Sequence, residues 1–347
     1  MKVKHWRLGV PRALFYYYYA PWWETFLENL GAEVVVSPPT SKEILDLGVG
    51  LAVAEACLPV KVYYGHAAWL APRVEALFVP RLVSVEQKSF ICPKLMGLPD
   101  MLRAAIKDCP PVIAPTVDLA RRPKEGLRAA IRATARALGA GNREALQAAA
   151  LAGARYREWL ARQREGGPYL GNSVPVGNWE QPPLTIGGGA PVDYPLKHGS
   201  RPVADTDISL AVGIVGHSYL LYDRYLGMDI PGKVARLGGR VVLPENIDPT
   251  LGEAACRQLP KRLYWTLGRK IMGTALHLME KEEIAGLIHL TAFGCGPDSL
   301  VGDLAERYAH RLGKPFLLLT LDEQTGEAGV ATRLEAFMDM LSRRRSA

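Results

Sequence analysis

The sequence predicts an α/β protein with two Rossmann-like (flavodoxin-like) parallel-sheet domains that face each other across a cleft. Two observations predict this fold. Short apolar or β-branched runs alternate with longer helical patterns at both ends of the chain, which is typical of βαβ units and parallel sheets. The chain of 347 residues also exceeds the usual size of one domain. A helical, Gly/Pro-rich middle segment separates the two alternating parts.

Residues 1–120 form the predicted N-terminal domain. An aromatic helix over residues 13–30, ended by Gly31, follows the first of its strands. The predicted strands are Arg7–Val10, Ala32–Val36, Leu77–Pro80 and Pro111–Pro115. Their apolar character is that of buried strands in a parallel sheet.

Residues 121–206 form a middle segment of different composition. Between Arg121 and Glu165 there are 11 Lys or Arg residues against 4 Asp or Glu, which accounts for the whole net charge of +7. Abundant Ala, Leu, Arg and Glu predict two amphipathic helices, broken between Gly139 and Gly141. From residue 166 to residue 206 there are 8 Gly and 7 Pro, a density typical of a connector.

This basic segment is either a solvated helical face or a surface that attracts an anion, such as a CoA phosphate or an acidic partner protein. No nucleic-acid motif and no interleaved aromatic residues accompany the charge, so we expect no nucleic-acid partner.

Residues 207–347 form the predicted C-terminal domain, in which the alternation resumes. The predicted strands are Leu210–Val215, Arg240–Leu243, Gly286–Leu290 and Pro315–Leu321. The predicted helices are Tyr219–Leu237, Leu263–Glu280, Asp298–Leu312 and a last one that begins at Val330. In open parallel sheets, ligands lie beyond the carboxyl ends of the strands, which places a site in the cleft between the domains.

The cellular setting follows from composition. No run of about 18 apolar residues predicts a membrane span, and no signal peptide is visible. The five cysteines are odd in number and scattered. We therefore expect a cytoplasmic protein without a disulfide framework.

Three of the cysteines share a context. Cys57, Cys92 and Cys295 each lie within two residues of a proline, in loops at the ends of predicted elements, and Cys295 is flanked by two glycines. Such loops hold ligands steadily, and thiolates bind zinc or iron–sulfur clusters. The absence of close cysteine pairs disfavours structural zinc. Buried, chemically inert cysteines remain an alternative.

The other two cysteines differ. Cys109 is a candidate fourth metal ligand, whereas Cys256 lies in a helical pattern and is expected in the core. A nucleophilic cysteine with His66 or His217 as its base is a further alternative. Together with Tyr219, these two histidines are the candidates for catalytic residues.

With these residues in hand, the chain resembles the 2-hydroxyacyl-CoA dehydratase-like family described as acyl-CoA dehydratase activase-related or CoA-substrate-specific enzyme activase-related. The resemblance covers both α/β parts and is weak across residues 121–206. The matching stretches are residues 9–17, 36–40, 55–66, 80–81, 92–100, 293–299, 321–329 and 332–337.

The resemblance implies that Cys57, Cys92 and Cys295 bind a [4Fe–4S] cluster between the domains. In the related dehydratases such a cluster performs low-potential one-electron chemistry on a CoA thioester. A separate ATPase activator with its own iron–sulfur cluster supplies the electron. Because this chain lacks the Gly-rich phosphate-binding motif of that ATPase, the resemblance implies the electron-accepting component, paired in a homodimer or heterodimer.

The resemblance leaves the reaction and the substrate open. A dehydratase (a lyase) or an ATP-dependent reductase component, acting on an acyl-CoA or another small molecule, is one hypothesis. A non-catalytic protein that carries a cluster or an electron is a second, and a metal-free α/β ligand-binding protein is a third.

Overall fold

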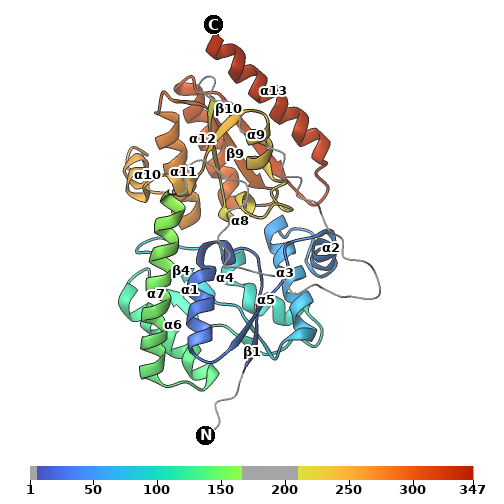
Figure 1. Ribbon diagram of the computed structural model, residues 1–347, viewed down its shortest axis with the longest axis vertical. Helices are drawn as coiled ribbons and strands as arrows, with labels where there is room; N and C mark the ends of the chain where they lie inside the picture. The colour runs from blue at the N-terminus through green and yellow to red at the C-terminus, as the bar shows by residue number, and fades with distance from the viewer. Residues whose placement is uncertain (1–5, 166–209, 347) are drawn as a thin grey trace.

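The protein consists of two α/β halves stacked end to end, as the computed structural model shows (Figure 1). The structure describes residues 6–165 and 210–346. The predicted connector, residues 166–206, lies outside the described residues. Every strand pairing in the described part of the chain is parallel, which confirms the predicted fold class.

The two halves contain four-stranded sheets of the same topology. The N-terminal sheet has the order β2-β1-β3-β5 and the C-terminal sheet the order β8-β7-β9-β10. The strands are β1 (Arg7–Val10), β2 (Glu33–Val36), β3 (Ala76–Phe78), β5 (Val112–Ile113), β7 (Leu210–Gly216), β8 (Gly239–Val242), β9 (Ile284–Ala292) and β10 (Phe316–Leu321). In both sheets the first strand lies between the second and the third. The strand order therefore reverses between β1 and β3, and between β7 and β9, where ligands bind in open α/β sheets.

Helices cover the N-terminal sheet, and a short pair of strands extends this half. The helices are α1 (Tyr16–Asn29), α2 (Lys42–Leu51), α3 (Leu58–Leu70), the 3₁₀ turn η1 (Ala71–Arg73), α4 (Pro93–Met96) and α5 (Leu98–Ala105). The sequence did not predict the extra pair, β4 (Arg81–Ser84) and β6 (Thr116–Asp118). These strands are short, and β6 is mostly exposed, so neither has a clear apolar pattern.

The C-terminal sheet is covered on both faces. The elements are α8 (Ser218–Leu221), α9 (Ile230–Arg236), the 3₁₀ turn η2 (Pro244–Asn246), α10 (Pro249–Cys256), α11 (Thr266–Met279), α12 (Gly296–Arg311) and α13 (Glu327–Ser346). Side chains of α9 and α13 join a hydrophobic cluster that continues into the N-terminal half. Side chains of α10, α11 and α12 form a second cluster on the opposite face of the sheet.

One helix prediction was wrong. The sequence predicts a single helix over residues 219–237, but the structure has two short helices, α8 and α9, with an irregular segment between them. Gly227 packs so tightly that an added Cβ would lie 1.8 Å from the carbonyl oxygen of Leu220. Met228 and Asp229 have left-handed backbones with φ of 52° and 47°, a conformation that a continuing right-handed helix excludes.

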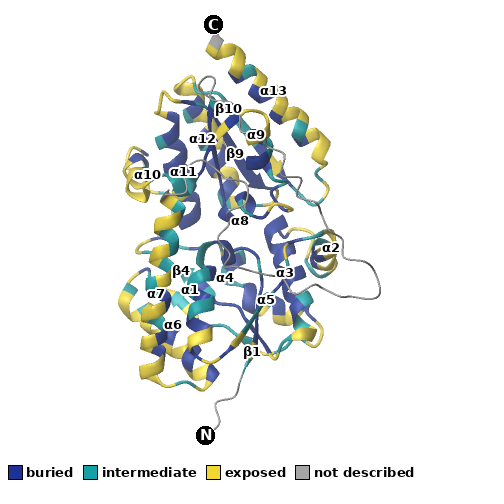
Figure 2. Ribbon diagram, in the orientation of Figure 1, coloured by how far each residue is buried: buried dark blue, intermediate teal, exposed yellow. Residues whose placement is uncertain are grey.

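The two predicted helices of the basic segment are present. They are α6 (Pro123–Leu138), which ends at the left-handed Gly139, and α7 (Asn142–Glu165). Helix α7 packs along α1 and reaches the C-terminal half at η2 (Figure 1). All 11 Lys and Arg residues of this segment are exposed (Figure 2). No described helix is both long enough and apolar enough to cross a membrane.

A buried polar network joins the halves. Asp223, in the segment between α8 and α9, accepts hydrogen bonds from the Tyr17 hydroxyl at 3.0 Å and from the Thr40 hydroxyl. His66 Nε2 lies 3.0 Å from Thr40 Oγ1. Because Thr40 already donates its only proton, His66 is the donor to Thr40. Burial lowers the pKa of His66 to about 3, so this imidazole is neutral in the folded protein.

Two glycines allow α2 and α3 to touch at the backbone. A Cβ on Gly48 would lie 1.9 Å from the carbonyl oxygen of Lys61, and a Cβ on Gly65 would lie 1.8 Å from that of Ile44. No side chain fits in either place. This contact fixes the position of α3 relative to α2.

The replacement Gly65→Ala should lower the free energy of unfolding by about 2 kcal/mol, because the helices must move apart. Gly50→Ala is the matched control: Gly50 is in α2, and nothing lies within 4 Å of its added Cβ. This control should be neutral or stabilise by up to about 1 kcal/mol, because alanine favours a helix. Urea denaturation measures both values, and equal effects would show that the helix contact is not tight.

Stability should also depend on pH through His66. Unfolded His66 takes up a proton near pH 6.5 and folded His66 only near pH 3, so this residue lowers stability as the pH falls from 6.5 towards 3. The loss is at most about 1.4 kcal/mol per pH unit. The variant His66→Gln lacks this pH-dependent loss of stability. The difference in free energy of unfolding between wild type and His66→Gln should therefore shrink between pH 7 and pH 5. A constant difference in urea denaturation would contradict this expectation, and His310→Gln, at an exposed site, is the control.

Candidate functional site

Three cysteines stand immediately before helices where the halves meet. Cys57 is the N-cap residue of α3, Cys92 of α4 and Cys295 of α12, and each helix has a proline in its first turn. Proline suits this position because its missing N–H has no helical partner to lose. Cys92 and Cys295 correspond in topology, since each follows the third strand of its sheet, with β4 intervening in the N-terminal half.

A single lysine ties the three cysteine loops together. Lys94, two residues after Cys92, donates a hydrogen bond to the carbonyl oxygen of Glu55 at 2.7 Å and a longer one to that of Gly294 at 3.4 Å. These two residues stand two before Cys57 and one before Cys295. Gly294 has a φ of 76°, and its Cβ position lies 3.6 Å from Cys57 Cα. The loops are therefore in direct contact.

Burial favours the protonated form of the Cys57 and Cys295 thiols. Burial raises the pKa of Cys57, and burial together with nearby Asp298 raises that of Cys295 to about 12. A nucleophilic cysteine needs a lowered pKa, so the site does not favour the nucleophile alternative. A metal, by contrast, displaces the proton from a thiol ligand as it binds.

Beside Cys295 lies a buried acid between two histidines. His217 directly follows β7, and His289 belongs to β9. Asp298 Oδ1 lies 3.2 Å from His289 Nε2, and its Oδ2 lies 3.8 Å from His217 Nε2. Burial alone would raise the pKa of Asp298, but the two imidazoles outweigh it and lower the pKa to about 2. Burial lowers the pKa of His217. The position between β7 and β9 is the switch point of this sheet.

The spacing of the donors tests which group they suit. Ligand atoms of His217, Cys295 and Asp298 all lie within 4.8 Å of one another, whereas the thiols of Cys57, Cys92 and Cys295 do not form such a group. Two thiolates on one zinc ion are at most about 4.6 Å apart. At least two of the three thiols are therefore farther apart than two ligands of a single ion. Cysteine thiolates are the donors that multi-iron clusters take as ligands, so the type of donor suits such a cluster.

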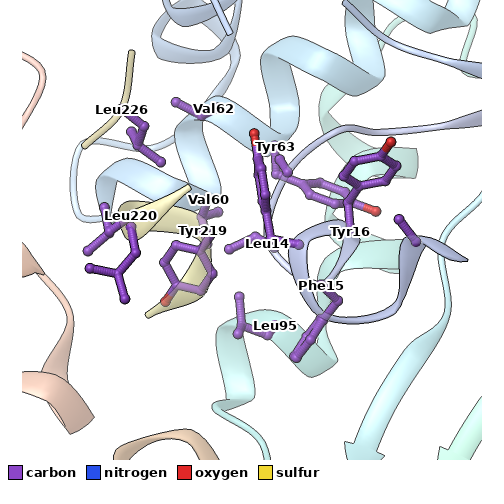
Figure 3. Packing of buried hydrophobic residues seen from close by; sticks show 14 of the residues in the cluster. Leu14, Phe15, Tyr16, Val60, Val62, Tyr63, Leu95, Tyr219, Leu220 and Leu226 are labelled. Carbon is purple, nitrogen blue, oxygen red and sulfur yellow. The ribbon is translucent and has the colours of Figure 1, made fainter. Parts of the chain in front are cut away.

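Apolar and aromatic side chains surround the cysteine loops. Tyr219 is 4% exposed and stacks on His217 with ring centroids 4.7 Å apart. Burial, followed by the nearby Cys295, raises its pKa far above 10. Val60, Leu95 and Leu220 belong to the same hydrophobic cluster as Tyr219 (Figure 3). Two of the candidate catalytic residues, His217 and Tyr219, thus lie at the cysteine site.

The remaining candidates lie elsewhere. His66 belongs to the buried network with Thr40 and Asp223. Cys109 precedes β5 and so lies at the amino edge of its sheet, opposite the carboxyl edge. Cys256 is the last residue of α10, packs partly buried against the second hydrophobic cluster and donates to the Arg269 carbonyl oxygen at 3.2 Å.

Sequence reasoning missed three residues of the site: Lys94, His289 and Asp298. Lys94 and Asp298 stand two and three residues after a predicted cysteine ligand, in the first turn of the following helix. Proximity to those cysteines was the available signal. Nothing in the local sequence marks His289, which lies inside a buried strand.

Comparison with known proteins shows to which family the chain belongs. No curated protein matches the chain. The family model of the CoA enzyme activase uncharacterised domain matches residues 7–247. This range contains Cys57, Cys92 and His217 and ends before Cys295. It supports the activase-related part of the resemblance and not the dehydratase itself. Because the match covers about two thirds of the sequence, the chain belongs to this CoA enzyme activase family.

Proposed function

We propose that the protein is the cluster-carrying, electron-transferring component of an acyl-CoA dehydratase system. In this proposal Cys57, Cys92 and Cys295 bind a [4Fe–4S] cluster where the halves meet. The observation that supports it best is the meeting of three cysteine loops from both halves, held by Lys94. When bound, such a cluster would supply one-electron chemistry at low potential.

The chain's own residues have distinct parts in this proposal. The three cysteines provide thiolates, and their helix N-termini and the Lys94 ammonium offset the negative charge of the ligands. Tyr219 and the apolar residues around it exclude water. His217 and Asp298 stand next to Cys295 and are not cluster ligands in this proposal.

The family match supports a place beside an acyl-CoA dehydratase, and the proposed electron donor is a separate ATPase activator with its own iron–sulfur cluster. Direct dehydration of an acyl-CoA by this chain is the second candidate. The proximity of His217 and Tyr219 to Cys295 favours it, because dehydration requires proton transfer. An acyl-CoA that changes the electron paramagnetic resonance spectrum of the reduced protein would select this second candidate.

Anaerobically prepared protein should contain about four iron and four sulfide ions per chain. Each of Cys57→Ser, Cys92→Ser and Cys295→Ser should lose most of this iron, because three ligands leave no spare. Cys109→Ser and Cys256→Ser are the controls, since both thiols lie outside the site, and they should keep it. Iron and sulfide analysis with electron paramagnetic resonance measures the outcome.

Wild-type protein that holds no iron and sulfide under these conditions would refute the cluster proposal. One zinc ion per chain, lost in Cys295→Ser and His217→Gln but kept in Cys92→Ser, would instead assign a single-ion site to His217, Cys295 and Asp298.

Lys94→Met should release iron to a chelator about tenfold faster than wild type, because residues that hold the ligand loops affect metal affinity by about 10–100-fold. Lys107→Met, at an exposed site away from these loops, is the control. Absorbance bleaching in the presence of a ferrous chelator gives both rates. Equal rates would show that Lys94 does not hold the loops.

A further inference from the structure

A cavity lies on the other side of β7 from the cysteine site. It has a volume of about 450 Å³, within the range of small-molecule sites. Ser218, just beyond β7, and Glu245, just beyond β8, line it, so it too opens at the carboxyl ends of strands. Helix α7 provides one wall and α11 another. None of the three site cysteines lines it.

Most charged side chains around this cavity have hydrogen-bond or ion-pair partners, and two do not. Arg269 forms ion pairs with Glu86 and, at 2.6 Å, with Glu253. Glu245 accepts a hydrogen bond from the Ser218 hydroxyl at 3.1 Å.

Asp248 accepts hydrogen bonds from the backbone N–H and the hydroxyl of Thr250. Lys270 in α11 and Arg164 in α7 are both exposed, and neither has a hydrogen bond or an ion pair with any described residue. The cavity therefore offers a ligand two free positive charges, those of Lys270 and Arg164.

The other residues that line the cavity determine what kind of ligand body fits there. Tyr156 and Trp159 stack on each other, with centroids 5.6 Å apart, and are half-buried at the cavity. The apolar lining also includes Leu160, Ile247, Leu267 and Ile271. Four acidic side chains line the same space against three basic ones, so the net charge of the lining does not favour a multiply charged anion such as phosphate.

We propose that this cavity binds an organic monocarboxylate with an apolar or aromatic body, whose carboxylate pairs with the Lys270 ammonium. The body packs against Trp159, Tyr156 and the aliphatic wall. A charge-assisted hydrogen bond of this kind supplies orientation and affinity, and the apolar wall supplies selectivity. The site is separate from the cysteine loops and does not depend on a bound cluster.

Isothermal titration calorimetry of the full chain with 3-phenylpropionate tests the proposal. Wild-type protein should bind this probe, and 3-phenylpropanol, acetate and inorganic phosphate should each bind at least about tenfold more weakly. Lys270→Gln should weaken the binding of 3-phenylpropionate at least about tenfold and leave the binding of 3-phenylpropanol unchanged. Lys261→Gln, an exposed lysine outside the lining, is the matched control and should bind as wild type does.

A second variant tests the wall. Trp159→Ala should weaken the binding of 3-phenylpropionate, and it should not make phosphate the preferred ligand. Circular dichroism and the melting temperature establish that each variant is folded. The proposal is overturned if 3-phenylpropionate does not bind at millimolar concentration, if Lys270→Gln binds it as wild type does, or if phosphate competes equally with it.

Discussion

The packing of the two carboxyl sheet edges against each other is the constraint on which the rest of the structure depends. Loops that follow parallel strands all leave the sheet at this edge. Because two such edges face each other, loops 200 positions apart in the sequence come into contact, as Lys94 and Gly294 show. The contact is maintained by one hydrophobic cluster that runs through both halves and by the buried hydrogen bonds to Asp223. Lys61 adds an ion pair with Glu323, between α3 and the loop after β10.

The common topology of the halves explains why two of the cysteines lie where they do. Cys92 and Cys295 both follow the third strand of a sheet and both precede a helix whose first turn contains proline. Cys57 breaks this correspondence, because it follows the second strand and an additional helix, α2. Its position depends on α3, whose contact with α2 leaves no room for a side chain at Gly48 or Gly65. The geometry of the cysteine site thus rests partly on two glycines that contact none of its donors.

Much of the fold could be predicted from the sequence because its main strands are short apolar runs and several of its helices have clear helical patterns. The eight strands of the two main sheets follow from apolar runs, and α1, α6, α7, α11, α12 and α13 follow from helical patterns, whereas α2 to α5 and α10 were not predicted. Parallel topology then indicates that the cysteine loops meet. The irregular segment before α9 could not be predicted, since the close approach of Gly227 to Leu220 is a tertiary contact. The role of Lys94 was equally hidden, because its hydrogen-bond acceptors are backbone carbonyls in distant loops. The cavity at Lys270 combines α7, α11 and two strand ends, a combination that no local pattern contains.

Burial affects the protonation of the cysteine site and links the binding of a group there to the packing of the two halves. Because burial raises their pKa values, the thiols of Cys57 and Cys295 stay neutral in the metal-free protein. The junction, where the two halves meet, therefore contains no unpaired thiolate charges from these residues, which would be unfavourable in a buried place. A group bound by all three cysteines would replace these protons and connect the two halves directly. Binding would then be linked to the packing of the junction, since any state with separated halves loses ligands from one side. For the same reason, mutations that loosen the Asp223 network should weaken retention of the bound group, although Asp223 contributes no ligand to it.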